Sequence, residues 1–222
     1  MRAAILAGGR LRVEAGLRVR LLDADLLICA DGGLRAARRL RIRPHAAVGD
    51  FDSASPALVA WARSAGATIV RHAVEKDQTD AELALDYAVS HGARDVEFFG
   101  ALGGRLDHLL ANVALLLRAR AKGARLRIVD GAVEAFLAGP RMPLDARPGD
   151  LVSLLSLSAR SSGVTTRGLK YPLRNAVLRE GSTLGISNEA VASGPSVSVR
   201  SGDLLIVRRR RRRRRAGLRA NV

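Results

Sequence analysis

Cysteine is nearly absent from this sequence, in which Cys29 is the single thiol among 222 residues. A lone cysteine cannot form an intramolecular disulfide, which excludes the small disulfide-stapled class of secreted domains. Near the N-terminus the only apolar stretch is residues 3–7, which is too short for the core of a secretory signal peptide. We therefore expect a cytoplasmic protein without disulfides.

Long apolar runs and aromatic side chains are also scarce. The run at residues 113–117 is typical, whereas a membrane-spanning helix needs roughly 20 apolar residues. Aromatic residues make up 3% of the chain, which is few for a protein that stacks the bases of single-stranded nucleic acid. Because 48% of the residues are hydrophobic, the chain can still bury a core. The sequence predicts a soluble globular protein with no membrane segment.

Negative charge is outweighed by positive charge, and the formal net charge is +16. Arg208 to Arg215 form an unbroken run of eight arginines, so this run carries half of the excess (16 − 8 = +8). A block of like charges repels itself and buries no apolar surface, which favours a disordered, solvated tail over residues 208–222. The alternative is an arm that makes non-specific contacts with nucleic-acid phosphates.

Strand-like and helix-like segments alternate through residues 1–131. The clearest helix is expected over residues 106–117, where apolar side chains recur at i, i+3, i+4 and i+7. Short apolar segments predict strands at 2–7, 26–30, 46–48, 67–70, 96–99 and 126–129. This alternation predicts an α/β fold, with an N-terminal Rossmann-like three-layer domain built around a mostly parallel sheet.

After Gly131 the pattern changes to short apolar runs separated by glycine, proline and aspartate. No helical period is sustained in this part of the sequence. The runs cover residues 133–138, 151–157, 164–169, 197–200 and 204–207. We expect a small C-terminal antiparallel β-sandwich domain over residues 132–207.

Aspartates gather where the predicted parallel strands end and the next helices begin. Asp50 and Asp52 follow one strand, and residues 77–80 carry a second pair after the next. Each aspartate alone could be a turn residue or a helix N-cap. Two closely spaced pairs at one sheet edge instead indicate a bound cation, and Mg²⁺ is the hard ion that carboxylates and phosphates both bind. Asp31 and Asp107 occupy similar positions after other strands.

Glycine pairs end several of the predicted strands, at residues 8–9, 32–33 and 103–104. Glycine lets backbone amides approach a phosphate closely, although it also serves ordinary tight turns. The third pair is the most informative, because Arg105 follows it and can donate two hydrogen bonds to a phosphate. The motif Gly-x-x-x-x-Gly-Lys-Ser/Thr is absent, which excludes a P-loop kinase. We interpret His108 as a residue that orients a carboxylate rather than a proton carrier.

Four motifs stand at these strand ends in a fixed order: Asp31-Gly32-Gly33, Gly49-Asp50-Phe51-Asp52-Ser53, Lys76-Asp77-Gln78-Thr79-Asp80 and Gly103-Gly104-Arg105-Leu106-Asp107-His108. Two more follow in the second domain, Gly168-Leu169-Lys170-Tyr171-Pro172-Leu173 and Ser187-Asn188-Glu189. Together they resemble the thiamine pyrophosphokinase family over nearly the whole chain, from Arg2 to Val207. Ala190, where many relatives have an aromatic residue, and the arginine run depart from the family pattern.

The resemblance implies Mg²⁺-dependent transfer of a diphosphate group from ATP to thiamine, which leaves AMP. It also implies a homodimer whose sites combine the α/β domain of one subunit with the β-sandwich of its partner. Under this resemblance the catalytic residues are Asp50, Asp52, Asp80 and Asp107, of which the first three bind the metal. The nucleotide and phosphate contacts are Asp31, Gln78, Thr79, Gly104 and Arg105, and the thiamine contacts are Thr165, Tyr171, Ser187 and Asn188.

Two other functions stay open on the residues alone. Leu6-Ala7-Gly8-Gly9-Arg10 suggests a nucleotidyltransferase acting on another small alcohol or phosphate, although residues 13–16 lack the basic side chain expected to hold a triphosphate. The arginine run suggests a nucleic-acid-binding protein. The residues also leave open whether Asp80 or Asp107 accepts the proton of the attacking hydroxyl.

Overall fold

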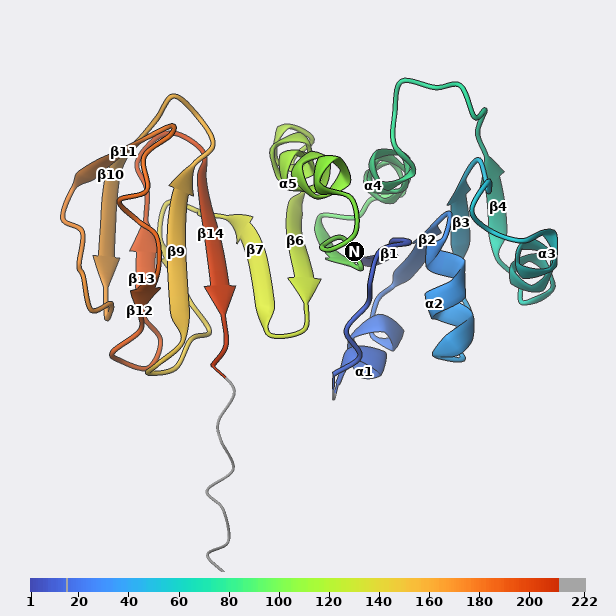
Figure 1. Cartoon of the computed structure of the whole chain (residues 1–222), viewed down its shortest axis with the longest axis horizontal. Helices are drawn as coiled ribbons and strands as arrows, with labels where there is room; N and C mark the ends of the chain where they lie inside the picture. The colour runs from blue at the N-terminus through green and yellow to red at the C-terminus, as the bar shows by residue number, and fades with distance from the viewer. Residues whose placement is uncertain (15, 212–222) are drawn as a thin grey trace, which may run out of the picture. The chain divides into compact units, whose positions relative to one another are not determined.

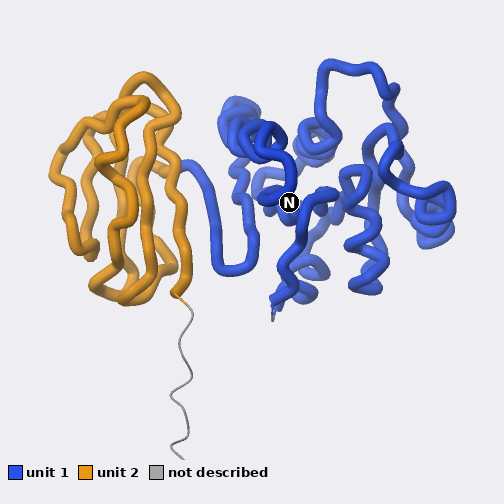
Figure 2. Tube along the Cα trace, in the orientation of Figure 1, with its two compact units in different colours: residues 1–137 blue, residues 138–222 orange. Residues whose placement is uncertain are grey.

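The computed structural model describes residues 1–14 and 16–211. The chain divides into two compact units, Met1–Leu137 and Ala138–Val222 (Figure 2). We expected the division after Gly131, six residues earlier than it is found. The difference is β7 (Val133–Leu137), which pairs antiparallel with β6 (Arg125–Asp130) and so extends the sheet of the first unit.

The first unit is built on a mostly parallel sheet with the strand order β7-β6-β5-β1-β2-β3-β4 (Figure 1). Only β7 runs antiparallel to its neighbour β6 within this unit. The chain order reverses at β1, which has β2 on one side and β5 on the other; such a switch point is where open α/β sheets bind ligands. The remaining strands are β1 (Arg2–Leu6), β2 (Leu26–Ala30), β3 (Ala46–Gly49), β4 (Thr68–Arg71) and β5 (Asp95–Phe99).

Helices cover both faces of this sheet, as Figure 1 shows. On one face α4 (Asp80–Ser90) packs against β2 and β3 and beside α5 (Leu106–Ala121), which lies on β6. The other face carries α1 (Leu17–Leu22), α2 (Gly33–Arg39) and α3 (Pro56–Ser64), whose apolar side chains join those of β1 and β2 in one buried cluster. The predicted three-layer α/β fold is therefore confirmed.

Two of the helix starts follow the expected capping chemistry. The Ser55 hydroxyl accepts a hydrogen bond from the Leu58 amide at 3.4 Å, ahead of the first-turn proline of α3. The Thr79 hydroxyl likewise accepts from the Glu82 amide at 3.2 Å, which fixes the start of α4 beside the acidic motif. Among the residues described, no helix combines the length and apolar character needed to cross a membrane.

The second unit consists of antiparallel strands in two groups. One group has the order β12-β9-β14 and the other β11-β10-β13-β8. Buried and less buried residues alternate along β9, as expected for a strand with one face toward a core. The prediction of a separate antiparallel β domain is confirmed. Its strands are β8 (Met142–Pro143), β9 (Leu151–Ser156), β10 (Arg160–Arg167), β11 (Ala176–Arg179), β12 (Asn188–Glu189), β13 (Ser196–Ser198) and β14 (Leu204–Arg209).

The last strand corrects the predicted start of the tail. We expected a disordered segment from residue 208, but β14 continues to Arg209 and the Arg208 side chain is 2% exposed. The Arg208 guanidinium donates to the backbone carbonyl of Asp145, and Arg210 pairs with the Asp145 carboxylate at 2.6 Å. A long side chain can bury its stem and still satisfy its charge, so the start of an arginine run can belong to a strand. The rest of the predicted tail lies outside the described residues.

Candidate active site

Three carboxylates meet at the carboxyl ends of β2 and β3. Asp31 follows β2, whereas Asp50 and Asp52 follow the adjacent parallel strand β3. One oxygen from each lies within 4.8 Å of the other two. The backbone is strained here, because Asp31 has φ 37° and Phe51 has φ 62°. Non-glycine residues adopt such angles at a cost of about 1 kcal/mol or more, and they concentrate at functional sites.

Gly49 allows a fourth carboxylate to approach this group. Its φ is +148°, and a Cβ at this position would lie 3.1 Å from both Asp31 Cβ and Asp80 Cγ. Those contacts are tighter than ordinary van der Waals packing, so any larger residue would push the two aspartates away. The glycine at the end of β3 therefore brings Asp31 and Asp80 together across the sheet edge.

Lys76 lies between two of the carboxylates. Its ammonium forms an ion pair with Asp50 and lies 3.2 Å from Asp80 Oδ1. Its hydrogen bond to Asp50 holds the pKa of that carboxyl below its usual value. Burial raises the pKa of Asp80, an effect that the nearby ammonium offsets only in part. Burial also opposes the charged form of Lys76, but its two acidic neighbours raise its pKa overall.

The carboxylate group has the donor set that a hard divalent cation requires. Asp31 Oδ1 is buried and has no hydrogen-bond donor among the described residues, and the buried Asp80 Oδ1 has only the Lys76 ammonium beside it, at 3.2 Å. A buried carboxylate oxygen without a donor is costly unless a cation is close. Mg²⁺ binds oxygen ligands and is commonly held by one or two carboxylates together with phosphate oxygens. The residues Asp31, Asp50, Asp52 and Asp80 therefore fit Mg²⁺.

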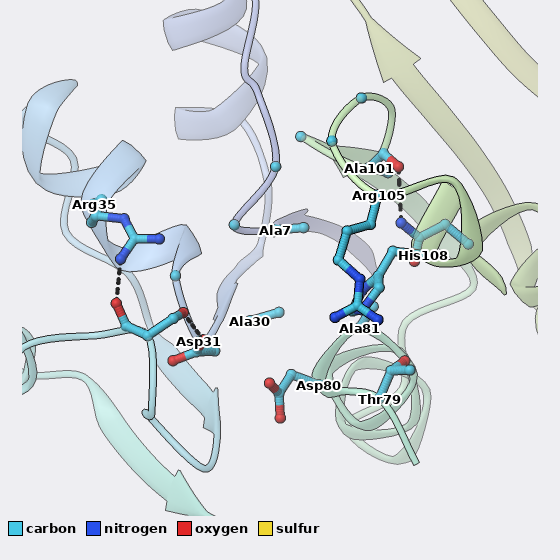
Figure 3. A pocket seen from close by; sticks show the side chains of 18 residues that line it. Ala7, Ala30, Asp31, Arg35, Thr79, Asp80, Ala81, Ala101, Arg105 and His108 are labelled. Atoms are coloured by element: carbon cyan, nitrogen blue, oxygen red, sulfur yellow. Dashed lines mark hydrogen bonds between the residues drawn. The ribbon is translucent and has the colours of Figure 1, made fainter. Parts of the chain in front are cut away.

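A cavity of about 310 Å³ opens beside these carboxylates, at the switch point between β1 and β5 (Figure 3). The turns after β1, β2 and β5 supply its glycines: Gly8, Gly9, Gly32, Gly100, Gly103 and Gly104. Figure 3 shows Asp31 and Asp80 on one side of the cavity and Arg105 reaching in from another. Glycine-rich backbone, a guanidinium and a carboxylate edge together form a site suited to a polyphosphate with its metal.

The structure places most of the predicted nucleotide residues in this cavity. Asp31, Thr79, Gly104 and Arg105 all line it, and so does Asp80, which was predicted as a catalytic and metal-binding residue. His108, which we interpreted as orienting a carboxylate, lines it too. After the hydrogen bond from Arg105, a Coulombic interaction with His108 is among the smaller effects that lower the pKa of Asp107.

Four of the residues predicted for the catalytic and nucleotide site do not line the cavity: Asp50 and Asp52, which belong to the carboxylate group beside it, and Gln78 and Asp107. The amide of Gln78 donates to Glu82 at 2.8 Å and to Asp86 at 3.3 Å, so it is bound within α4. Asp107 is exposed and pairs with Arg105 at 2.5 Å. The hydrogen bond from Arg105 lowers the pKa of Asp107. In this structure Asp107 is therefore a partner of the arginine rather than a member of the carboxylate group.

Comparison with known proteins agrees with this geometry. The family model described as thiamin pyrophosphokinase, catalytic domain, matches residues 18–128, and the model for the vitamin B1 binding domain matches residues 141–204. Thiamine pyrophosphokinase of Bacillus subtilis is 32% identical over 206 residues, which cover 92% of this chain and 96% of the relative.

The chain belongs to the thiamine pyrophosphokinase family.

Solved structures of this family have the same fold. The Bacillus subtilis enzyme has a TM-score of 0.83 at 31% identity, covering 95% of this chain and 99% of that one. The Geobacillus thermodenitrificans enzyme has a TM-score of 0.78 at 35% identity, covering 95% and 98%. Because the catalytic match spans β2, β3 and α4, the carboxylate group lies within the family's catalytic domain.

The residues predicted to contact thiamine lie in the part matched by the vitamin B1 binding model. The Tyr171 ring is exposed, with the residue at 63%, and Lys170 Nζ lies 5.6 Å from the ring centroid. Asn188 is buried, and its side chain bonds to the Tyr171 backbone. Ser187 has φ 58°, and the Thr165 hydroxyl accepts from the Asn175 amide at 3.0 Å. Tyr171 and Ser187 are surface residues, whereas Asn188 is buried and supports the backbone of Tyr171.

Several cavity residues were missed by the sequence analysis. The Arg35 guanidinium on α2 donates to the Ser53 carbonyl, and the Ser53 hydroxyl donates to Asp31. Asn112 on α5 is buried and donates to the Ala101 carbonyl at 2.8 Å, which holds the turn after β5. Ser53 stood inside a quoted motif and could have been found there. No local pattern marks Arg35 or Asn112, since each is defined by a contact with another segment.

Proposed function

We propose that this chain is a thiamine diphosphokinase, which transfers the diphosphate group of ATP to the hydroxyethyl group of thiamine and releases AMP. The observation that carries the proposal is the carboxylate group beside a glycine-lined cavity, inside the segment that matches the family's catalytic domain. The nucleotidyltransferase alternative is not favoured, since both halves of the chain match the two domains of one family.

In this proposal Asp50, Asp52 and Asp80 hold Mg²⁺, with Asp31 beside them. The bound metal would neutralise charge on the phosphate oxygens. Attack of the thiamine hydroxyl forms an O–Pβ bond and breaks the bond between Pβ and the oxygen that bridges to Pα, so AMP leaves. The chain's own part is to position the phosphates against the glycine amides of the cavity and to supply the guanidinium of Arg105, with Thr79 and Gly104 beside it. Gln78 reaches the nucleotide in this scheme only by giving up its bonds to α4.

A carboxylate must accept the hydroxyl proton, and Asp80 is favoured over Asp107. Asp80 lines the cavity in which the phosphates are positioned, so its place suits proton acceptance better than that of an exposed side chain. Asp107 is exposed, and the hydrogen bond from Arg105 lowers its pKa.

Thiamine would be held by Thr165, Tyr171, Ser187 and Asn188 of the second unit, supplied by the partner in a homodimer. The exposed ring of Tyr171 supports this, because thiamine carries a permanent positive charge that favours an aromatic face. Exposed apolar side chains at Leu184, Ile186 and Val191 of the same unit also support burial against a second copy. We place the reaction in the cytoplasm, since the single cysteine is a buried free thiol of β2.

A second binding activity is suggested by a cavity of about 760 Å³ in the second unit. Arg147, Arg210 and Arg211 line it, together with Asp145 and Asp150. This basic surface would contact nucleic-acid phosphates without sequence preference. The buried Arg208 takes no part in it.

One incubation tests the main proposal. Purified protein is mixed with ATP, Mg²⁺ and thiamine, and the products are separated into AMP, ADP and free pyrophosphate. Formation of AMP and thiamine diphosphate in equal amounts, only when thiamine is present, supports the proposal. Release of ADP, or of pyrophosphate without thiamine diphosphate, would contradict it.

A further inference from the structure

Lys76 occupies the place among the aspartates where a cation is needed. Its ammonium contacts Asp50 and lies 3.2 Å from Asp80 Oδ1. The side chains of Lys76 and Asp50 are only 16% and 8% exposed, so water screens their attraction poorly. The carboxylate group thus already has a positive charge supplied by the chain.

The same oxygens cannot serve Lys76 and a divalent metal at once. A metal bound by Asp50 and Asp80 would stand within a few ångströms of the ammonium, and like charges at that distance in a partly buried site repel strongly. The Lys76 side chain is a flexible four-carbon stem, which can withdraw its charge without moving the backbone.

The loop that carries Asp50 is held independently of Lys76. Arg71 donates to the Asp50 carbonyl at 2.9 Å, and its guanidinium lies over the Phe51 ring at 5.0 Å from the centroid. The Asp52 amide donates to Asp50 Oδ1 at 3.1 Å. These contacts hold the loop of Asp50 without using Lys76.

We propose that Lys76 is a positioning residue, the internal counter-ion of the metal-free site, which holds Asp50 and Asp80 together until a divalent metal displaces it. This inference rests on the proposed function for the identity of the metal. In this inference Lys76 competes with the metal for the same carboxylates, whereas a purely structural ion pair would not affect metal affinity.

The experiment is a titration of the full chain with Mn²⁺ alone, followed by the EPR signal of the free ion. Lys76→Met removes the charge and keeps the length of the side chain, whereas Lys76→Arg keeps the charge. Lys122→Gln is the matched control, because Lys122 pairs with Asp86 at 2.9 Å away from the cavity. We expect Lys76→Met to bind Mn²⁺ roughly tenfold more tightly than the unaltered chain, which corresponds to about 1.4 kcal/mol. Lys76→Arg and Lys122→Gln should stay near the unaltered affinity.

A folded Lys76→Met protein whose Mn²⁺ affinity is unchanged or weaker overturns the inference, and so does the absence of Mn²⁺ binding to every variant. Thermal unfolding supplies the second measurement. Without metal the midpoint of Lys76→Met should fall, and Mg²⁺ should raise it by more than it raises that of the unaltered chain. If Lys76→Met does not fold, Lys76→Gln is compared in the same two measurements.

The two proposals fail separately. An unaltered chain that makes no AMP from ATP and thiamine contradicts the proposed function, whatever the Mn²⁺ titration gives. An active chain in which loss of the Lys76 charge leaves Mn²⁺ affinity unchanged contradicts only the role of Lys76.

Discussion

The side chain of Asn188 holds the backbone of Tyr171 from both directions. Its Oδ1 accepts from the Tyr171 amide at 3.0 Å, and its Nδ2 donates to the Tyr171 carbonyl at 2.7 Å. Asn188 Oδ1 also accepts from the Glu189 amide at 2.9 Å. Because its oxygen and its nitrogen are already bonded within the protein, the Asn188 side chain affects a ligand mainly by fixing the position of Tyr171.

Separate substitutions of Asn188 and Tyr171 should distinguish a residue that supports the structure from a residue that contacts thiamine. Asn188→Ala leaves the Tyr171 amide and carbonyl without their partner, so we expect a loss of about 1–3 kcal/mol in the free energy of unfolding and a raised KM for thiamine. Tyr171→Ala should leave stability nearly unchanged, because its ring is exposed. It should raise the KM for thiamine several-fold or more, which corresponds to the loss of about 1–2 kcal/mol of binding free energy. Denaturant unfolding and steady-state kinetics measure both effects. Equal loss of stability in the two variants would contradict this division of roles.

The metal assignment makes Asp52 essential to activity but not to the fold. Asp52→Asn removes one negative charge from an exposed position in the group, so we expect turnover to disappear and the metal-free unfolding midpoint to stay or rise. Asp23→Asn, at the exposed end of α1, is the control and should keep full activity. Substantial turnover by Asp52→Asn would remove Asp52 from the proposed ligands.

Gly49 provides a test of the geometry of the sheet edge. Gly49→Ala combines an unfavourable backbone angle with contacts at 3.1 Å to Asp31 and Asp80. Gly66→Ala, at φ +93° with no atom within 4 Å, carries the backbone cost alone. We expect each variant to lose about 1 kcal/mol or more of stability, but only Gly49→Ala to lose Mn²⁺ affinity and turnover. Similar Mn²⁺ affinity in both variants would show that the close approach is unimportant.

Much of this site follows from local patterns. Asp31 and Asp50 each follow a short apolar run, and adjacent parallel strands deliver such residues to one edge, so their meeting could be predicted. The antiparallel addition of β7 could not, because the run 133–137 reads equally well as the start of the next domain. The roles of Arg35 and Asn112 could not be predicted either, because each side chain contacts a segment that is distant in the sequence.

The prediction of a disordered tail from residue 208 was wrong because it relied on composition alone and could not include a tertiary contact. Arg208 follows an apolar run of four residues, and alternation along β14 places it on a buried face beside Asp145. A like-charge block predicts exposure only for residues without such a partner.

Two truncations test the revised end of the second unit. Removing residues 208–222 deletes the buried Arg208 and the Arg210 pair with Asp145, so the unfolding midpoint should fall clearly. Removing residues 212–222 keeps these contacts and the Arg211 amide bond to Asp150 at 2.9 Å. Its midpoint should exceed that of the shorter protein, and its binding to duplex DNA at low salt should be weaker than that of the full chain. Equal midpoints in the two proteins would mean that the end of β14 contributes little.

The shared site predicts complementation between two inactive proteins. Tyr171→Ala impairs the thiamine contact of the second unit, and Asp52→Asn impairs the metal contact of the first. To make the background low, the first variant is combined with Ser187→Trp, which adds bulk at a surface position with φ 58°. If each site takes its first unit from one subunit and its second from the partner, a mixed dimer contains one site with neither defect. Mixing the two proteins should then restore activity. The activity should approach one quarter of the unaltered level when random exchange makes about half of the dimers mixed and each mixed dimer has one of its two sites intact.

Native mass spectrometry of differently tagged proteins verifies the exchange. A mixture of Asp52→Asn with Asp80→Asn, both in the first unit, is the negative control. Verified exchange without recovered activity would mean that each site is completed within one subunit.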